Sequence, residues 1–165
     1  VILENPNGAY LLDQSLLSVN AYAADGSFLG GEPMPLVSVL PGQKLGISRQ
    51  FGLCDETPVD RIEVAVSAEE YLPSQQTAYF GSENVTLQDG AVSGELVNLA
   101  GIDLMVFYAT AIVYDAAGQV IGGGSLTVDG LAAGGRASVQ IPVTVNGTPA
   151  SAEIFGVLTR KSLGK

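Results

Sequence analysis

Apolar and polar residues alternate with a period of two along much of this chain. The alternation is clear in residues 44–48, 61–67 and 136–143, where every second residue is Leu, Ile, Val or Ala. A strand that buries one face has this period, so the pattern predicts half-buried β-strands. Pairs that favour tight reversals lie between or beside such runs, at residues 25–26, 41–42, 89–90, 117–118, 129–130 and 146–147. Gly and β-branched residues interrupt every helical window, and only one short turn is expected, near residues 67–72.

A segment of the first half of the chain returns in the second half. Residues 20–31 and 112–123 share a Tyr-centred strand, a Gly turn and a closing Gly-Gly pair. Tyr22 and Tyr114 are 114 − 22 = 92 positions apart, and Asn5 and Asn98 are 98 − 5 = 93 apart. Self-similarity at a fixed spacing is typical of repeated domains, so the chain is predicted to contain two modules of one kind.

Several short strands at regular spacing favour an antiparallel β-sandwich of the immunoglobulin-like type in each copy. The predicted fold is therefore all-β, with two tandem sandwiches formed by residues 1–72 and residues 79–165. A polar stretch with Pro and two Gln, residues 73–78, is the expected linker. Nothing equivalent to residues 84–92 precedes Val1, so the first module is expected to lack a lead-in strand.

The amino-acid composition and net charge limit which classes of molecule this protein can be expected to bind. Hydrophobic residues make up 47% of the 165 positions and charged residues only 15%, which places the chain among folded proteins. The net charge of −10 repels phosphate backbones, so nucleic acid is not an expected partner. No run of about 18 apolar residues occurs, so no membrane span is predicted in this segment.

The second copy resembles a known family. Residues 94–98 and 111–118 are similar to FxLYD-type immunoglobulin-like domains of bacterial cell-envelope proteins, with Tyr114-Asp115 preserved and Ala111 and Val113 in place of the aromatic and the Leu. The first copy departs further, because its acid is displaced to Asp25. The resemblance implies an extracytoplasmic location and a spacer or surface role with an unknown protein or cell-surface partner. Because the sequence begins at Val1 without Met, a signal sequence or lipid anchor removed upstream is also expected.

Catalysis is not expected from these residues. The chain has no His, which excludes Ser-His-Asp and Cys-His systems and imidazole-ligated metals. The lone Cys54 is expected to be a packing residue, and Lys44 lies in an alternating run that predicts a solvent-facing side chain. The predicted function is therefore a non-catalytic spacer or adhesion module, with no resident cofactor.

Calcium is the one metal that the acidic residues suggest. Ca²⁺ binds carboxylate and carbonyl oxygens, and acidic loops between stacked sandwiches can supply them. The candidates surround the expected junction: Asp55, Glu56, Asp60, Glu69 and Glu70. No Asp-x-Asp-x-Asp-Gly loop occurs. The alternative function is accordingly a calcium- or carbohydrate-binding module that uses the groove around residues 69–80.

Overall fold

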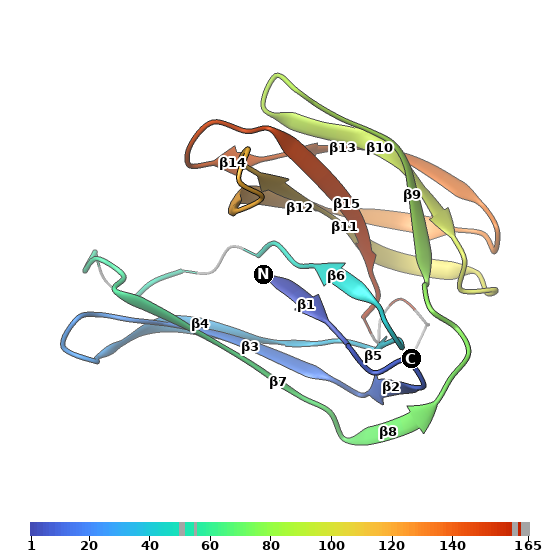
Figure 1. Cartoon of the computed structure of the whole chain (residues 1–165), viewed down its shortest axis with the longest axis horizontal. Helices are drawn as coiled ribbons and strands as arrows, with labels where there is room; N and C mark the ends of the chain where they lie inside the picture. Colours follow the sequence, from blue (N-terminus) through green and yellow to red (C-terminus); the bar gives the residue numbers. More distant parts are fainter. Residues whose placement is uncertain (50–51, 55, 160–161, 163–165) are drawn as a thin grey trace.

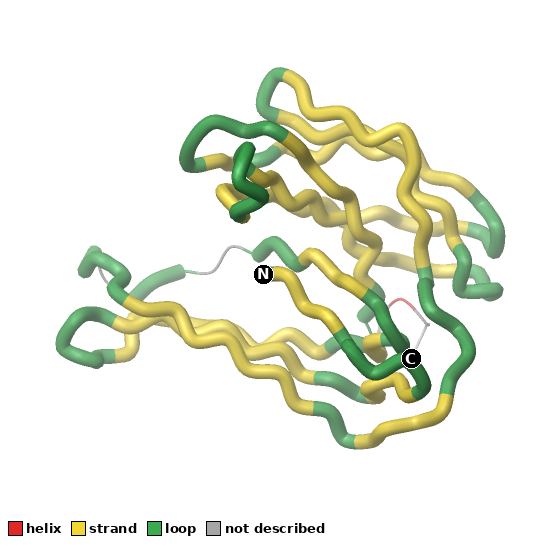
Figure 2. Tube along the Cα trace, in the orientation of Figure 1, coloured by secondary structure: helices red, strands yellow, loops and turns green. Residues whose placement is uncertain are grey.

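The computed structural model describes residues 1–49, 52–54, 56–159 and 162, and it confirms the all-β prediction (Figures 1 and 2). The first half of the chain, residues 1–73, forms β1 (Ile2–Glu4), β2 (Tyr10–Asp13), β3 (Leu16–Tyr22), β4 (Phe28–Pro35), β5 (Ser38–Val39), β6 (Lys44–Gly46), β7 (Arg61–Ser67) and β8 (Glu70–Pro73). The second half, residues 80–159, forms β9 (Phe80–Gln88), β10 (Ala91–Asn98), β11 (Leu104–Tyr114), β12 (Val120–Leu131), β13 (Arg136–Pro142), β14 (Thr144–Val145) and β15 (Ser151–Val157).

These strands form five antiparallel sheets. The orders are β1-β6, β5-β2-β8 and β4-β3-β7 in the first half, and β13-β10-β9 and β14-β12-β11-β15 in the second. Each sheet of the described chain draws its strands from one half only. Among the described residues there is no helical segment with the length and apolar character that a bilayer crossing requires.

Strands with similar sequence also pair in the same register. Tyr22 lies opposite Phe28 in the β3–β4 pair, and Tyr114 lies opposite Val120 in the β11–β12 pair. In both pairs the register shifts at the residue just before the Tyr. The 92-residue spacing of the sequence therefore matches equivalent positions in space, and it provides a way to compare the two halves residue by residue.

The second half encloses a continuous apolar core between its two sheets. Twelve buried residues form it: Val92, Leu96, Leu104, Phe107, Ala109, Ala111, Val113, Leu131, Val139, Ile141, Ile154 and Leu158. Strand β9 closes one side, where the Phe80 ring packs on Phe107 with ring centroids 4.8 Å apart. Burial of this size is the main stabilising contribution in a small sandwich.

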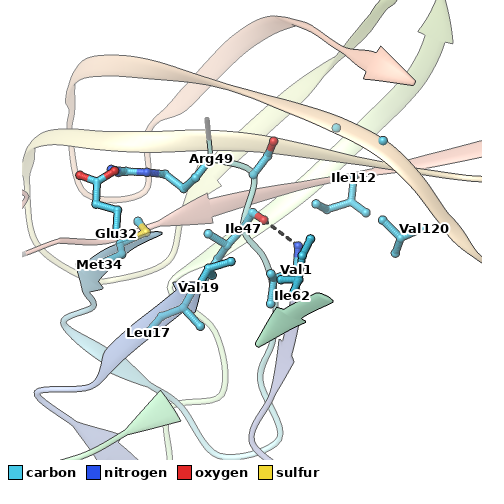
Figure 3. A pocket seen from close by; sticks show the side chains of 13 residues that line it. Val1, Leu17, Val19, Glu32, Met34, Ile47, Arg49, Ile62, Ile112 and Val120 are labelled. Atoms are coloured by element: carbon cyan, nitrogen blue, oxygen red, sulfur yellow. Dashed lines mark hydrogen bonds and ion pairs between the residues drawn. The ribbon is translucent and has the colours of Figure 1, made fainter. Parts of the chain in front are cut away.

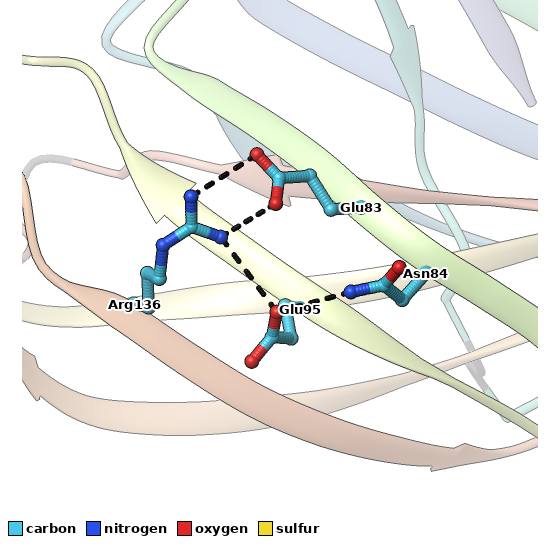
Figure 4. A network of polar contacts seen from close by, with 4 residues as sticks. All are labelled: Glu83, Asn84, Glu95 and Arg136. Carbon is cyan, nitrogen blue, oxygen red and sulfur yellow. Dashed lines mark hydrogen bonds and ion pairs between the residues drawn. The ribbon is translucent and has the colours of Figure 1, made fainter.

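On the solvent-exposed face of the β13-β10-β9 sheet, a network of charged side chains connects β9 to its neighbouring strands (Figure 4). Arg136 on β13 donates to both carboxylate oxygens of Glu83 on β9, at 2.6 and 3.3 Å. Its guanidinium also lies 3.6 Å from Glu95 on β10, which accepts a bond from Asn84. The Arg136 hydrogen bonds hold the pKa of Glu83 below its usual value. The network thus links all three strands of the β13-β10-β9 sheet.

The two halves pack through the outer face of β6. Gly46 lies against Phe155 and Ile112 so closely that a Cβ atom has no room there. The Thr110 hydroxyl donates to the Gly46 carbonyl across the same contact. A second buried cluster also spans the halves, since Val157 packs with first-half residues that include Leu17, Met34, Leu36, Val39, Leu45 and Ile47.

An ion pair borders this contact. Lys44 Nζ lies 2.5 Å from Glu153, and the Tyr114 hydroxyl donates to the same carboxylate at 2.5 Å. Burial raises the pKa of Glu153, but the bonds from Lys44 and Tyr114 outweigh it and leave that pKa lowered. The bond to Glu153 raises the pKa of Lys44. The Lys44 side chain is exposed, as the alternation of the sequence predicted, and its ammonium group pairs with the second half.

The connection between the halves runs from Pro73, the last residue of β8, to Phe80, the first of β9. The expected linker, residues 73–78, falls almost wholly in this stretch. Tyr79 anchors its end, because its hydroxyl lies 2.5 Å from the Ser38 hydroxyl of the first half. The prediction of a helical turn near residues 67–72 is wrong. That segment ends β7 and forms β8, which pairs with β2, and this pairing overrides the local helical preference.

Candidate functional site

One apolar sheet face in the first half is uncovered. Ile62, Val64 and Val66 project from the same side of β7, and they are 60%, 48% and 37% exposed. Their alternation predicts a buried face, so this expectation is wrong for β7. We refer to these three side chains as the β7 face. Apolar side chains in a row along one strand form a patch that single exposed residues do not.

The matched strand of the second half shows what covers such a face. Ala152, Ile154 and Gly156 on β15 oppose β11 in the register in which the β7 face opposes β3. Ile154 is only 3% exposed, and Gly156 is buried. Strand β9 covers them, and the Phe80 ring lies directly over Gly156. The β7 face is therefore exposed because no described strand of the first half takes the place of β9.

The same comparison identifies an open sheet edge on β1. In the second half, β10 pairs with β13 on one side and with β9 on the other. In the described residues, β1 pairs with β6 alone. Val1 exchanges two backbone bonds of 2.9 Å with Ile47 of the β6 segment, and Asn5 donates to Gln43. Hydrogen-bonded residues alternate along an antiparallel strand, so the amides and carbonyls of Ile2 and Glu4 face away from β6.

A cavity of about 260 Å³ lies behind this edge (Figure 3). Side chains from both halves line it, and most of them are apolar: Val1, Leu17, Val19, Met34, Ile47, Ile62, Ile112 and Val120. It connects the inner side of the β4-β3-β7 sheet with the outer side of β11 and β12. Apolar cavities of this kind suit apolar side chains, because water inside them has few polar partners.

Three glycines of the second half are replaced by larger residues in the first half. Gly94, Gly124 and Gly156 have no room for a Cβ, since Ile154, the Pro142 carbonyl and Phe80 lie against them. Close approach without a side chain lets the two sheets of the second half meet. The matched first-half residues are Val1, Glu32 and Val66, and each is larger. Val1 and Glu32 are among the residues that line the cavity.

The charged groups at the cavity have polar partners. Arg49 lies 2.8 Å from Glu32 at the rim, and the amino group of Val1 donates to the Ile47 carbonyl. Burial lowers the pKa of the Val1 amino group. The lining therefore offers apolar contact together with a neutralised ion pair, an arrangement that favours binding of apolar side chains.

The acidic residues proposed for calcium do not gather here. Asp55 lies outside the described residues. Glu56 and Asp60 are exposed before β7, while Glu69 and Glu70 are exposed around the start of β8, where Glu70 pairs with Asp13. No group of three or more acidic, Cys or His side chains within the described chain is placed to hold a metal ion.

The exposure of Cys54 also differs from the prediction. It was expected to be a buried packing residue, yet it is exposed in the segment before β7. Its amide donates to the Leu29 carbonyl at 2.6 Å, which holds the segment against β4. Backbone bonding rather than side-chain burial positions this residue.

Sequence analysis missed the β7 face, although a signal was present. The missing lead-in strand and the apolar alternation of residues 61–67 were both recognised, but not combined. Comparison of the chain with protein-family models, with curated proteins and with solved structures gives no match.

Proposed function

We propose that this chain is a non-catalytic interaction module, built as two tandem immunoglobulin-like sandwiches, in an exported protein of a bacterial envelope. Its binding surface is the β7 face together with the free edge of β1, and its partner is a segment of another protein. One observation carries the proposal: Val64 is 48% exposed where its counterpart Ile154 is 3% exposed. The exported location rests on the resemblance to FxLYD-type domains.

The packing of the halves favours an interaction role over a spacer role. A linear spacer stacks its modules end to end, so that the entry and exit of the chain lie far apart. Here the end of β15 packs against the β6 segment of the first half, because Val157 shares a buried cluster with Leu45 and Ile47. Side-by-side packing shortens the molecule and makes one half a support for the other.

The residue types support a non-catalytic role. The chain has no His and one Cys, and the cavity holds a single acid, Glu32, which is paired with Arg49. General acid–base chemistry needs a proton donor or acceptor aimed at a substrate. The apolar lining supplies binding contacts instead, which suit recognition of side chains.

A peptide-display selection tests this proposal. The full chain is immobilised, a phage library of random 12-residue peptides is selected on it, and the enriched peptides are synthesised and measured by fluorescence anisotropy. We expect Val64→Glu to weaken their binding at least about tenfold, because a carboxylate inside an apolar contact loses its hydration. Met105→Glu is the matched control, since Met105 is 66% exposed but lies outside the β7 face and the cavity.

The proposal fails if no peptide is enriched. It also fails if the enriched peptides bind the Val64→Glu and Met105→Glu variants equally, because the β7 face is then not the binding surface.

A further inference from the structure

We propose that this chain forms a symmetric dimer in which β12 of one copy pairs antiparallel with β12 of a second copy. The contact is the free edge of β12 over residues 125–129, and we refer to it as the β12 edge. It is a different surface from the one in the proposed function, so this inference goes beyond that function. An open strand edge is a template for pairing with another chain, and proteins usually protect such edges.

The β12 edge presents unpaired backbone groups. Strand β14 pairs with β12 only at residues 122–123, and beyond them the described residues pair β12 with β11 alone. The Asn146 amide donates to the Ile121 carbonyl, so backbone groups of Ile121 face β14. Backbone groups alternate in direction along an antiparallel strand. Beyond residue 123, the residues whose amides and carbonyls point away from β11 are therefore Ser125, Thr127 and Asp129, and all of them are exposed.

The matched edge of the first half is protected by proline. Strand β4 is the counterpart of β12 and is also an edge strand. Pro33 takes the place of Ser125 in the matched register, and Pro35 takes the place of Thr127. Proline on the free side of an edge strand costs no ladder bond, and it denies an approaching strand an amide donor. The first half therefore lacks the two amides that a docking strand needs, and the second half keeps them.

The sequence of the β12 edge is complementary to itself. When two copies are placed antiparallel about Thr127, Thr127 lies opposite its own symmetry mate, and each Ser125 lies opposite an Asp129. These positions make three hydrogen-bonded pairs, each of which exchanges two backbone bonds. Like charges directly opposite each other destabilise a strand pair. This register avoids them, because each carboxylate faces a hydroxyl.

The register about Thr127 is longer than its neighbours. A shift of the centre to residue 126 places residue 129 opposite residue 123, which already pairs with Thr144. A shift to residue 128 places residue 125 opposite Leu131, whose carbonyl accepts a bond from Asn98. Each shift leaves two hydrogen-bonded pairs instead of three. The pairing about Thr127 is therefore the most stable of the three.

The side chains beside the edge suit a second copy. Two Thr127 side chains lie directly opposite each other on the outer side of the sheet, and cross-strand Thr pairs stabilise antiparallel strands through their hydroxyls. On the core side, Leu126 of one copy lies opposite Val128 of the other. Both residues are half-buried where they pack against the second-half core. Strand pairing removes further apolar surface of these residues from water.

A cation lies where the acid of the second copy arrives. Ser125 and Arg49 line one hollow of about 310 Å³. Asp129 of the second copy lies opposite Ser125, so its carboxylate is on the side of the sheet that carries Arg49. Arg49 is paired with Glu32, but a guanidinium has five donors and can bind a second carboxylate. This attraction offsets part of the repulsion between two chains of net charge −10.

Sedimentation velocity of the full chain tests the dimer. We expect the sedimentation coefficient to rise as the protein concentration increases from about 10 µM to about 1 mM, the range in which small contacts associate. Thr127→Pro gives β12 the residue found at the matched place in β4. We expect it to weaken association at least about tenfold, because the central pair loses both amide donors. Thr127→Val is the matched control, since it keeps the amide and the β-branched shape.

A cysteine at the centre of the register provides a second measurement. Cys54→Ser removes the native thiol, and Thr127→Cys is added to it. Hydrogen-bonded partners in an antiparallel pair have Cα atoms about 5.5 Å apart, a distance that a disulfide spans. Under mild oxidation, we expect this variant to form covalent dimers at least about tenfold faster than Met105→Cys in the same background. Met105 is also exposed, but it lies on β11 outside the β12 edge.

The outcomes are distinct from those of the peptide selection. A parent chain that stays monomeric over the whole concentration range overturns the dimer. Equal association of Thr127→Pro and Thr127→Val, or equal cross-linking of the two cysteine variants, overturns the β12 edge as the contact. If Thr127→Pro does not fold, the cross-linking rates decide. Val64→Glu should leave the dimer intact, and a dimer that it abolishes assigns the contact to the β7 face and overturns this proposal.

Discussion

Asn5 and Asn98 make the same hydrogen bonds at equivalent places in the two halves. Each side-chain amide donates to three backbone carbonyls, those of Tyr10, Val39 and Leu40 for Asn5, and those of Ile102, Leu131 and Ala132 for Asn98. Each side-chain carbonyl accepts a bond from the amide two residues later. Both residues are almost fully buried. The two Asn residues, 93 positions apart in the sequence, therefore make equivalent sets of hydrogen bonds. Each set connects the end of one strand to a neighbouring sheet.

Asn98→Ala should destabilise the protein by about 2 to 4 kcal/mol, because three buried carbonyls lose their donor and one amide loses its acceptor. Urea unfolding followed by circular dichroism measures the change. Asn146→Ala is the control, since Asn146 is exposed and only its backbone amide is bonded. Equal stability of the two variants would show that the hydrogen bonds of the Asn98 side chain do not contribute to the free energy of unfolding.

Val64→Thr and Ile154→Thr should differ strongly, although the residues occupy matched positions. Ile154→Thr removes buried apolar volume and places a hydroxyl in the core of the second half, at a cost of about 2 to 4 kcal/mol. Val64→Thr should change stability by less than about 1 kcal/mol, because Val64 is already half exposed. Chemical denaturation of both variants measures this difference. Similar losses would mean that the β7 face is covered in solution.

Gly46→Ala should weaken the packing of the two halves by about 1 to 3 kcal/mol, because the new methyl group meets Ile112 and Phe155. Gly8→Ala is the control, since a Cβ at Gly8 meets no atom within 4 Å. A double variant, Gly46→Ala with Phe155→Ala, measures the coupling by thermal unfolding. Additive effects in this cycle would contradict a direct contact between the two positions.

Stability should fall as the medium becomes acidic, and Glu153 should account for part of the loss. The pKa of Glu153 is lowered in the folded protein, so the unfolded chain takes up the proton first as pH falls. Its stabilising contribution is complete above the ordinary carboxyl range and disappears as pH falls through the lowered pKa. Melting temperatures between pH 3 and pH 7 should therefore change less in Glu153→Gln than in the parent.

Calcium should leave the melting temperature unchanged at about 1 mM, because a ligand stabilises only a fold that holds a site for it. The described acidic residues proposed as ligands are dispersed around β7 and β8. Scanning calorimetry with calcium and with magnesium as the control tests this expectation. A rise of several degrees with calcium alone would support the calcium-binding alternative.

The strand content was predictable because alternation and turn residues are local signals. Residues 61–67 and 136–142 were expected as strands and form β7 and β13. The glycines of all the predicted turns adopt positive φ, including Gly130, which lies within β12 rather than between strands. Strand β8 was missed because Glu70 to Pro73 has little alternation, and only its pairing with β2 makes it a strand.

The exposure of the β7 face was less accessible to sequence reasoning. Exposure of Ile62 depends on the absence of a covering strand, which is a property of tertiary structure and not of the residues near Ile62. The partnership of Lys44 with Glu153 joins positions 109 residues apart, and no local pattern indicates it. The match of Val66 to Gly156 was available in principle, but it requires the strand register that only the structure provides.

The three glycines that seal the second half also restrict how it can vary. Any side chain at Gly94, Gly124 or Gly156 pushes apart sheets whose contact holds the core together. The first half carries Val1, Glu32 and Val66 at these places and already accommodates bulk beside a cavity. Amino-acid replacements can therefore accumulate around the cavity and the β7 face without unfolding the protein. A protein of this design can acquire new recognition specificity in one half while the other half keeps the chain folded.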